Sequence, residues 1–306
     1  MADAKSVLIW APPAFVLLWA TGFVGAKFGL PYAEPMTFLA LRFAIAAALL
    51  GLWAWARGEY RRDNGGGVRD LRGALIVGAL IHGVYLGGVF TAISLGAGAA
   101  VSALIVGLQP VLTALFAGTM LGERLSARQW LGMALGLAGV ALVVARKAGG
   151  GEVETVPILL CVAGLIGISY ASILQKRRQI TERLAGDSAV QFASAAAFCL
   201  IVAAVFEDFR IDWTLNFALA LTWMVVALSL GAITLLLILI RSGEASKTAS
   251  LFFLVPGVTA VMAWAMFGET FGGIELAGLI ATMVGVRLVT RTTGKPSPQA
   301  LGKLSR

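Results

Sequence analysis

Charge is scarce in this sequence. Its 306 residues are 59% hydrophobic and only 13% charged, which is about half the charged share of a typical soluble domain. A chain this poor in charge cannot cover itself with polar groups in water. The composition therefore excludes an ordinary soluble protein and predicts an integral membrane protein whose surroundings are the lipid bilayer.

Residues that serve catalysis or metal binding are also scarce. The chain has one histidine and two cysteines, and Cys161 and Cys199 both lie inside apolar stretches. The 16 acidic residues fall in loops or at the ends of apolar runs, so we expect no buried carboxylate that carries a proton or binds sodium. The sequence contains no metal-ligand cluster, phosphate-binding loop or nucleophile with a neighbouring base. We expect no enzyme, no metal and no cofactor.

Long apolar runs fill most of the chain. A helix needs about 20 mostly apolar residues to cross a bilayer, and ten runs approach or exceed this length. They lie at 7–30, 36–56, 72–94, 98–121, 127–145, 156–175, 188–206, 218–240, 247–267 and 271–291. The predicted fold class is an all-α integral membrane protein with ten transmembrane helices.

The basic residues indicate the orientation of these spans. The net charge of +8 would suggest nucleic-acid binding on a soluble chain, but here Lys and Arg lie between apolar runs. If successive runs cross the membrane in alternating directions, one side of the membrane receives nearly all of the Lys and Arg residues. The other side receives Lys27, Arg146, Lys147 and Arg210, and Arg42 lies within a span. Since cytoplasmic loops are rich in Lys and Arg, we predict two cytoplasmic termini and no nucleic-acid partner.

The second half of the sequence repeats the first. A shift of 146 residues places residues 102–144 on residues 248–290 without a gap. The matched pairs include Pro110 with Pro256, Gly122-Glu123 with Gly268-Glu269, Gly132 with Gly278, and Gly139 with Gly285. A shift of 149 residues gives a weaker match of Arg42-Phe43 with Gln191-Phe192.

The repeat predicts two five-helix units, residues 1–148 and residues 149–306. Because five is odd, the second unit must enter the membrane in the opposite orientation, which puts Glu123 and Glu269 on opposite sides. Inverted repeats are typical of secondary transporters, whose substrate site lies near the midplane between the repeats.

Four segments resemble the EamA family of the drug/metabolite transporter superfamily. They are Leu17–Lys27 (LLWATGFVGAK), Leu41-Arg42-Phe43, Gln109-Pro110 and Leu121–Leu125 (LGERL). The resemblance implies ten spans in two inverted halves, a multi-pass protein of a prokaryotic inner membrane, and the branch that exports amino acids and aromatic compounds. The motifs do not separate this branch from sugar-phosphate, nucleoside or drug carriers. The second half departs from the pattern, so the two halves need not bind substrate equivalently.

His82 and Tyr85 are the first candidates for substrate contact. His82 is the only histidine, it lies near the middle of its span, and Tyr85 shares its helix face three residues later. Ionisable groups inside membranes are costly and often functional. The alternative is a neutral histidine whose hydrogen bonds are satisfied by a helix neighbour.

Other aromatic or polar side chains within the spans are candidates for lining the same cavity, with packing in the helix core as the alternative. These residues are Trp19, Gln109, Tyr170, Phe253 and Trp264.

Arg42 and two prolines complete the candidate set. Arg42 is either a cation for a substrate carboxylate or an arginine that pairs with carbonyl groups and pins its helix, and the second interpretation is favoured. Pro110 and Pro256 fall halfway along their spans, where each frees the carbonyl four residues earlier, at Val106 and Phe252. We expect paired kinks that shape the cavity and serve as hinges, rather than static kinks.

Smaller motifs indicate local packing. Gly132 and Gly136 have the spacing of close helix contacts, and a dimer face is the alternative, so we expect a monomer or weak dimer. Ser126 with Gln129 predicts a capping box at the start of the fifth span.

Together these features predict a secondary transporter that exports small organic solutes by alternating access through a central cavity. The expected solutes are amino acids, including aromatic or apolar ones, and related amphiphilic compounds. The alternatives are a carrier of cationic drugs or other metabolites, or a membrane sensor or structural protein that transports nothing.

Overall fold

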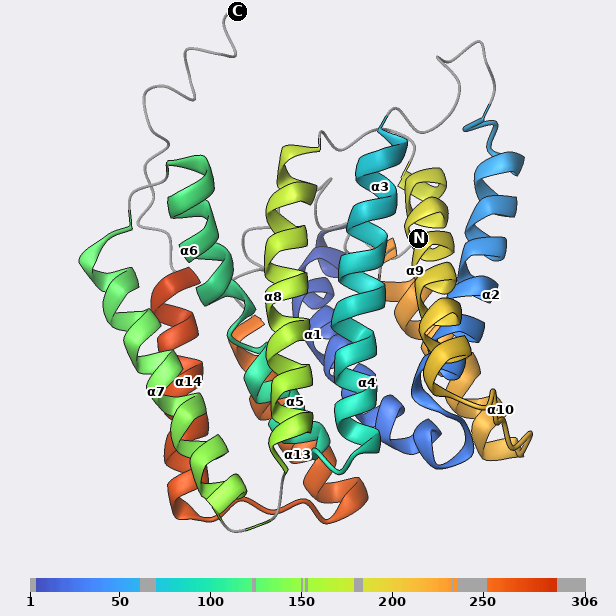
Figure 1. The fold of residues 1–306 in the computed structure, drawn as a ribbon. Helices are drawn as coiled ribbons and strands as arrows, with labels where there is room; N and C mark the ends of the chain where they lie inside the picture. Colours follow the sequence, from blue (N-terminus) through green and yellow to red (C-terminus); the bar gives the residue numbers. More distant parts are fainter. Residues whose placement is uncertain are drawn as a thin grey trace, which may run out of the picture.

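The computed structural model describes residues 4–60, 70–122, 125–149, 151, 154–178, 184–232, 234–235 and 252–290. Within these residues the chain is largely helical, and the helices pack together in one bundle (Figure 1). The helices are α1 (Ala4–Gly29), α2 (Pro35–Ala56), α3 (Leu71–Gly78), α4 (Leu86–Ser94), α5 (Ala99–Val106), α6 (Gln109–Leu121), α7 (Ala127–Gly149), α8 (Thr155–Arg177), α9 (Leu184–Phe206), α10 (Leu215–Thr222), α13 (Val255–Phe267) and α14 (Gly273–Thr290). In the described residues, β-type pairing is limited to an isolated bridge between Ala33 and Ile211.

The predicted spans agree with the helices. In the described part of the chain, nine helical stretches are long and apolar enough to cross a membrane, and Phe252–Phe267 is a shorter apolar helix. Four of these nine spans are built from more than one segment, among them Leu71–Ser94, which joins α3 to α4, and Ala99–Met120, which joins α5 to α6. The eighth span is seen as Leu215–Ala232, and the later part of the predicted run 218–240 lies largely outside the described residues. The prediction of ten helices in an all-α membrane fold is confirmed.

The ends of the helices follow from local chemistry. α2 starts with Pro35 at its first turn, where the missing N–H is not needed. α7 starts at a capping box, in which Gln129 N–H donates to Ser126 Oγ at 3.3 Å and Ser126 N–H donates to Gln129 Oε1 at 2.9 Å. The predicted capping box is therefore confirmed.

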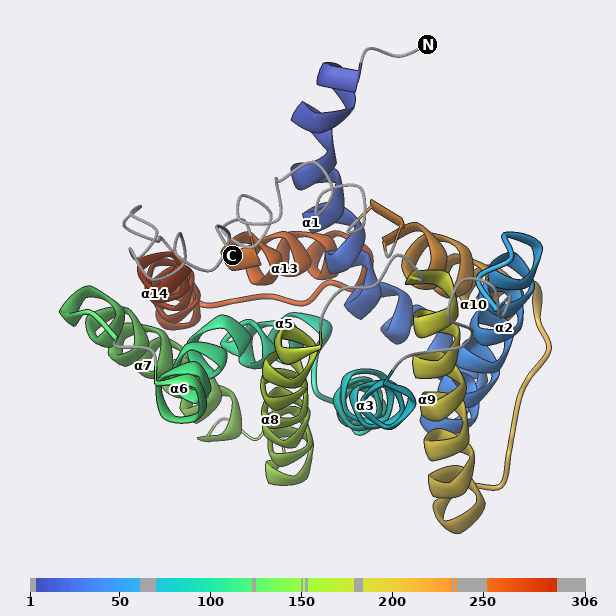
Figure 2. The same cartoon turned by 90° about the horizontal axis from the view of Figure 1, so that it is seen from above.

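The two halves pack as an inverted pair. α7 and α14 lie side by side in both views and run in opposite directions (Figures 1 and 2). A Cβ on Gly139 would lie 2.5 Å from Gly278 O, and a Cβ on Gly132 would lie 2.7 Å from Gly285 O. Since Gly132 matches Gly278 and Gly139 matches Gly285 in the sequence repeat, each glycine contacts the counterpart of the other. Such reciprocal contacts arise when a two-fold axis relates the two halves.

The α2 and α9 pair repeats this relation at the helix ends. Glu207, just after α9, accepts hydrogen bonds from the N–H groups of Met36 and Thr37 at the start of α2, at 2.7 and 2.8 Å. Glu59, just after α2, accepts one from the N–H of Gly186 in the first turn of α9, at 2.8 Å. Each half therefore caps a helix of the other half, and negative charge at a helix start is favourable.

The ends of α6 and α13 are also matched. Gly122 follows α6 with φ 69°, and Gly268 follows α13 with φ 68°. Glycine adopts this left-handed conformation without strain and so ends a helix readily. The two helices end at opposite faces of the bundle (Figure 1), which fits the inversion. Glu123 itself lies outside the described residues.

Two π-helical segments occupy corresponding positions in the halves. Segment η3 covers Ala79–Tyr85 within the third span, and η4 covers Trp223–Ala232 within the eighth. The shift of 146 residues that relates the halves places the whole of η3 inside η4. π-helical turns are rare and occur frequently at functional sites, so these segments direct attention to the space between them.

Candidate functional site

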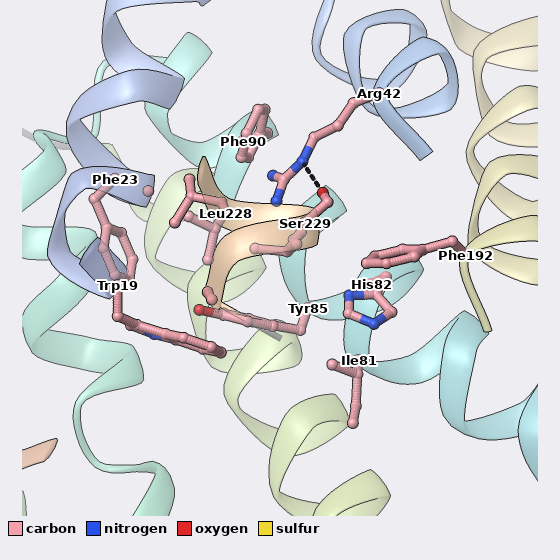
Figure 3. Close-up of a pocket in the computed structure, with 14 residues that line it drawn as sticks. Trp19, Phe23, Arg42, Ile81, His82, Tyr85, Phe90, Phe192, Leu228 and Ser229 are labelled. Atoms are coloured by element: carbon pink, nitrogen blue, oxygen red, sulfur yellow. Dashed lines mark hydrogen bonds between the residues drawn. The ribbon is translucent and has the colours of Figure 1, made fainter. Parts of the chain in front are cut away.

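A cavity of about 90 Å³ lies where the two π-helical segments face each other. Its walls come from α1, α2, η3, α4, α9 and η4 (Figure 3). The polar side chains that line it are Arg42, His82, Tyr85 and Ser229, and the others are glycine, alanine, aliphatic or aromatic. A water molecule needs about 10–15 Å³ by a comparable measure, so the cavity has room for several waters or for a small organic group.

Arg42 enters this cavity from α2 and is only 5% exposed. Its Nε donates to Ser229 Oγ at 3.1 Å. Ser229 in turn donates to the carbonyl of Met224, five residues earlier on η4, at 3.2 Å. Because the hydroxyl proton is used by Met224, the lone pairs of Ser229 face the arginine. Figure 3 shows the guanidinium group pointing into the space above Tyr85.

His82 and Tyr85 lie on η3 and line the same cavity, and their contact with a substrate stays a prediction. The His82 ring packs against Phe192 with ring centroids 4.5 Å apart, and against Phe43 at 5.6 Å. Phe43 and Phe192, which match each other in the weaker repeat, stack at 5.6 Å. The histidine is therefore held by aromatic rings from both halves.

Trp19 joins this cavity to a narrower one of about 20 Å³, which Tyr85, Gln109 and Pro110 also line. The Trp19 ring packs edge-on against Phe252 with centroids 5.5 Å apart. Gln109 Nε2 donates to Ser172 Oγ at 3.1 Å. Two of the predicted residues, Trp19 and Gln109, therefore lie beside the cavities.

Phe252 occupies the place that was predicted for its neighbour Phe253. Phe252 lines the narrower cavity, whereas the Phe253 ring lies under the guanidinium group of Arg287, 5.0 Å from its centroid. The sequence reasoning also missed Phe90 and Ser229 as lining residues. For these two residues the sequence offered no clear signal, because Phe90 resembles the many other apolar side chains of the spans and Ser229 has no polar counterpart in the first half.

Tyr170 and Trp264 do not line either cavity. Trp264 is 62% exposed on α13, and Tyr170 is 39% exposed on α8, where its ring meets the edge of Phe116. Both residues lie within their spans, but they face outward. The site proposed below leaves these two residues out.

The two prolines lie at breaks between helical segments, and not at kinks within continuous helices. Pro110 lies in the first turn of α6, which is separated from α5 by a turn at residues 107–108. Pro256 lies in the first turn of α13, directly after the short 3₁₀ segment Phe252–Leu254. A Cβ on Gly107 would lie 2.6 Å from Pro256 Cγ, so the break in one half packs against the proline of the other. Their action as hinges stays a prediction.

The acidic residues require one correction. Glu275, in the first turn of α14, is only 6% exposed, so the prediction of no buried carboxylate is wrong at this position. Its Oε1 lies 3.9 Å from Nε of Arg146. A carboxylate in the first turn of a helix is stabilised by the helix dipole, which explains its burial at the end of a span. In the part of the chain that the structure describes, no carboxylate lines the cavity.

Ion pairs lie at both ends of the bundle. At one end, Lys27 Nζ lies 2.5 Å from Glu269 Oε1, and the Glu269 carboxylate also accepts hydrogen bonds from the N–H groups of Ala99 and Ala100 at 2.9 and 3.1 Å. It therefore ties α1 and the loop after α13 to the start of α5. Beside it lies a polar cavity of about 280 Å³, which Lys147 also lines.

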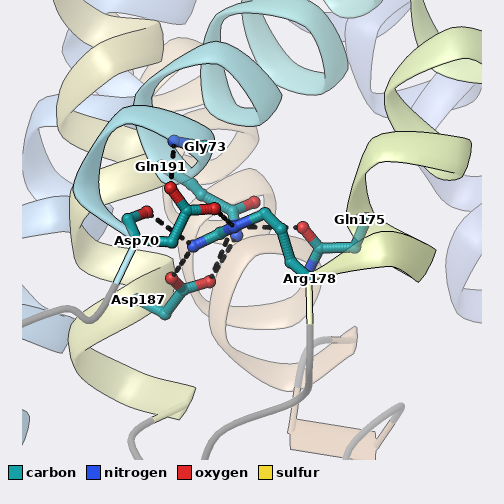
Figure 4. A network of polar contacts seen from close by, with 6 residues as sticks. All are labelled: Asp70, Gly73, Gln175, Arg178, Asp187 and Gln191. Atoms are coloured by element: carbon teal, nitrogen blue, oxygen red, sulfur yellow. Dashed lines mark hydrogen bonds and ion pairs between the residues drawn. The ribbon is translucent and has the colours of Figure 1, made fainter.

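At the other end, Arg178 connects three helices (Figure 4). It bonds to Asp70 at 2.9 Å and to Asp187 at 2.5 Å. Gln191 Nε2 donates to the same Asp187 at 2.7 Å. The N–H of Gly73 and the guanidinium group of Arg178 lower the pKa of the Asp70 carboxyl below its ordinary value of 3.8.

Across the described residues, no group of three or more His, Cys, Asp or Glu side chains has the arrangement of a metal site. The cavity is suited to binding a small molecule by non-covalent contacts. It combines one guanidinium group, one imidazole and two hydroxyl groups with an apolar and aromatic wall, as binding sites for small amphiphilic molecules do.

Known proteins match this chain over nearly its whole length. It is 28% identical over 289 residues to the uncharacterized transporter YvbV of Bacillus subtilis, covering 94% of this chain and 92% of that protein. It is 26% identical over 283 residues to a Salmonella typhimurium protein named "Probable amino-acid metabolite efflux pump", covering 89% of this chain and 90% of that protein. A solved crystal structure with 20% identity aligns with a TM-score of 0.60 over 98% of this chain and 99% of that chain, which supports the fold.

The model of the EamA-like transporter family matches twice, at residues 7–145 and at residues 155–291. The two matches correspond to the two halves that the glycine contacts and the reciprocal caps relate. The resemblance read from the sequence motifs is thereby confirmed, and so is the prediction that the chain is a transporter rather than an enzyme. This chain is a multi-pass membrane protein that belongs to the EamA-like transporter family.

Proposed function

We propose that the protein is a secondary transporter that exports small organic solutes by alternating access through the cavity around Arg42, His82 and Tyr85. The expected solutes are amino acids, including aromatic and apolar ones, and related amphiphilic compounds. The observation that carries the proposal is a partly polar cavity between two inverted halves, at the position where such transporters bind substrate. The name of the Salmonella relative, an amino-acid metabolite efflux pump, supports the choice of solute.

A counterflow assay tests this function. Purified protein in proteoliposomes loaded with one unlabelled solute should accumulate the same labelled solute transiently, and a panel of amino acids and cationic drugs would identify the solutes. Liposomes without protein are the control. If no member of the panel exchanges while the protein is folded and correctly inserted, the proposed solute class is wrong. Exchange of cationic drugs alone would favour the second candidate, a cationic-compound carrier.

The assignment of the site is tested by His82→Ala and Tyr85→Ala. We expect each variant to lower the exchange rate at least 10-fold with normal protein abundance, because each removes a polar group from the cavity. Trp264→Ala is the matched control, since this large aromatic side chain lies outside the cavity. If both cavity variants exchange solute at the wild-type rate, the assignment is wrong.

We propose a prokaryotic inner-membrane location with both termini in the cytoplasm, which the distribution of Lys and Arg supports. Single cysteines at Asn64 and Phe271 test it, because the two positions should lie on opposite sides. An impermeant thiol reagent added to whole cells should label only the cysteine at position 271. Equal labelling of both would contradict this topology.

We propose transport that is facilitative, or at most weakly coupled to protons. A pH gradient of two units is worth about 2.7 kcal/mol per proton, so strong coupling would concentrate solute far above equilibrium. We expect accumulation to stay near equilibrium. Large accumulation that disappears in His82→Ala would instead identify His82 as the proton carrier.

A further inference from the structure

We infer that the cavity recognises its solute through a single carboxylate bound by Arg42, and that an ammonium group on the solute adds little to binding. The solute class is therefore an amphiphilic monocarboxylate with an apolar or aromatic body, including organic acids that have no amine. This inference rests on the proposed function and deepens it, because it states which group of an amino acid the site reads.

The first support is the state of the arginine. Arg42 is more than nine-tenths buried and points into the cavity, yet Ser229 is its only hydrogen-bond partner in the described part of the chain, and no carboxylate there pairs with it. A guanidinium group stays charged at neutral pH and presents a planar fork of donors. A buried charge without a counter-ion is unfavourable. A carboxylate bound by the remaining N–H groups would both neutralise the charge and satisfy the fork.

The second support is what an ammonium group would meet. The polar side-chain groups that the described residues bring to the cavity are a guanidinium, an imidazole and two hydroxyl groups, and none of these is an anion. Among the described residues that line the cavity, the one that carries a formal charge is Arg42, and its charge is positive. Aromatic faces such as Trp19 attract cations, but they do not offset repulsion from a charge of the same sign in a site with little water.

The third support is the asymmetry between the halves. Gln191 matches Arg42 in the weaker repeat, but its amide donates to Asp187 in the network of Figure 4 rather than entering the cavity. In the described part of the chain, the cavity is therefore lined by one cation and not by a symmetric pair. One cation fits one carboxylate, so dicarboxylates should bind more weakly than monocarboxylates.

The inference also orients the solute. Arg42 and Ser229 hold the carboxylate at one side of the cavity, and the aromatic groups Trp19, Tyr85 and Phe90 surround the remaining space (Figure 3). The body of the solute should therefore lie against these rings. This arrangement accounts for an apolar wall around a single charged group.

Four probes that share a phenyl ring separate the possibilities. They are 3-phenylpropionate with a carboxylate alone, phenylalanine with a carboxylate and an ammonium, phenethylamine with an ammonium alone, and phenylsuccinate with two carboxylates. Exchange of each labelled probe is measured in proteoliposomes containing the full chain. We expect 3-phenylpropionate to exchange at least as well as phenylalanine, and both to exceed phenethylamine and phenylsuccinate by at least 10-fold.

Variants of Arg42 connect this preference to the side chain. Arg42→Gln should reduce the advantage of 3-phenylpropionate over phenethylamine at least 10-fold, and Arg42→Lys should retain part of it, because Lys keeps the charge but loses the fork. Arg210→Gln is the matched control, since this arginine is exposed outside the spans. Ser229→Ala gives a second variant that leaves the charge in place, and it should weaken exchange of 3-phenylpropionate without favouring phenethylamine.

The results distinguish failure of the proposed transport function from failure of the carboxylate inference. If no probe and no amino acid exchanges in wild-type protein, the proposed function fails. If solutes exchange but phenethylamine matches 3-phenylpropionate, or folded Arg42→Gln keeps the wild-type preference, the function stands and the carboxylate inference is overturned.

Discussion

The contact between α7 and α14 predicts a large effect for a small substitution. In Gly139→Ala the added methyl group would lie 2.5 Å from the carbonyl oxygen of Gly278, whereas carbon atoms normally approach to about 3.5–4.0 Å. The clash is with backbone, so no side chain can move aside. The two helices must separate by roughly 1 Å.

The magnitude follows from three effects. Overpacking of a close contact costs about 1–3 kcal/mol, and a gap of about 1 Å loses up to roughly half of the dispersion energy of neighbouring contacts. Helix propensity acts in the opposite direction, because Ala is favoured over Gly by about 1 kcal/mol within a helix. We expect Gly139→Ala to lower the free energy of unfolding by about 2 kcal/mol.

Gly149→Ala is the matched control. Gly149 is the last residue of the same helix, and an added Cβ there has no atom within 4 Å. This variant should be neutral or slightly more stable than wild type. Unfolding by increasing SDS in mixed micelles, followed by tryptophan fluorescence, would measure both. If Gly139→Ala is as stable as Gly149→Ala, the close contact between the halves does not exist as described.

The inversion adds a second test of the same contact. Gly285 is the counterpart of Gly139, so Gly285→Ala should cost a similar amount. In the double variant Gly139→Ala/Gly278→Ala, the two residues touch each other, and the second substitution should cost less than the first because the helices have already separated. Fully additive losses would contradict this reasoning.

Three further predictions concern the polar contacts at the ends of the helices. Glu207→Ala should lower the free energy of unfolding by about 1–2 kcal/mol and Glu59→Ala by less, within the range measured for helix caps. The reason is that, among the described residues, Glu207 caps two backbone N–H groups and Glu59 caps one; equal losses in SDS unfolding would contradict it. For Asp70, the lowered pKa means that its carboxylate stabilises the folded state above pH 3.8, and that this contribution fades as the pH falls further. The stability difference between wild type and Asp70→Asn should therefore be full at neutral pH and shrink in acid, and a difference that grows in acid would refute the assignment. Exchanging the charges in Lys27→Glu/Glu269→Lys should not restore the stability lost in Glu269→Gln, because an ammonium cannot accept the N–H groups at the start of α5; full recovery in a double-mutant cycle would show that the ion pair alone matters.

Much of the fold was predictable because the bilayer imposes simple rules on sequence. Apolar runs of sufficient length located the spans, and the matches of Gly132 with Gly278 and of Gly139 with Gly285 helped to reveal the repeat. That the matched glycines meet crosswise between α7 and α14 is seen only in the structure. The segments η3 and η4 were not predictable in this way. A π-helical turn changes which carbonyl each N–H reaches, and this change leaves hydropathy unaltered.

The site was predictable in depth but not in direction. Counting residues along a span places Tyr170 and Trp264 within the membrane, as it does Trp19, but of these three only Trp19 faces the cavity. The rotation of a helix about its axis is set by its neighbours, which an apolar run with little amphipathic pattern does not reveal. The same lack of direction explains the choice of Phe253 over Phe252. For Arg42 the sequence left two interpretations open, and only the partner Ser229 and the surrounding space favour recognition of a carboxylate.

The reciprocal caps at α2 and α9 have a consequence for the origin of the chain. Where the carboxylate of one half caps the helix of the other, and the reverse also holds, the contact has the self-complementary form of a symmetric dimer interface. Neither half alone has its full set of helix caps. A single ancestral five-helix chain could have met these requirements only by pairing with a second copy inserted upside down. Two separately expressed halves, divided between α7 and α8, should accordingly find each other in the membrane.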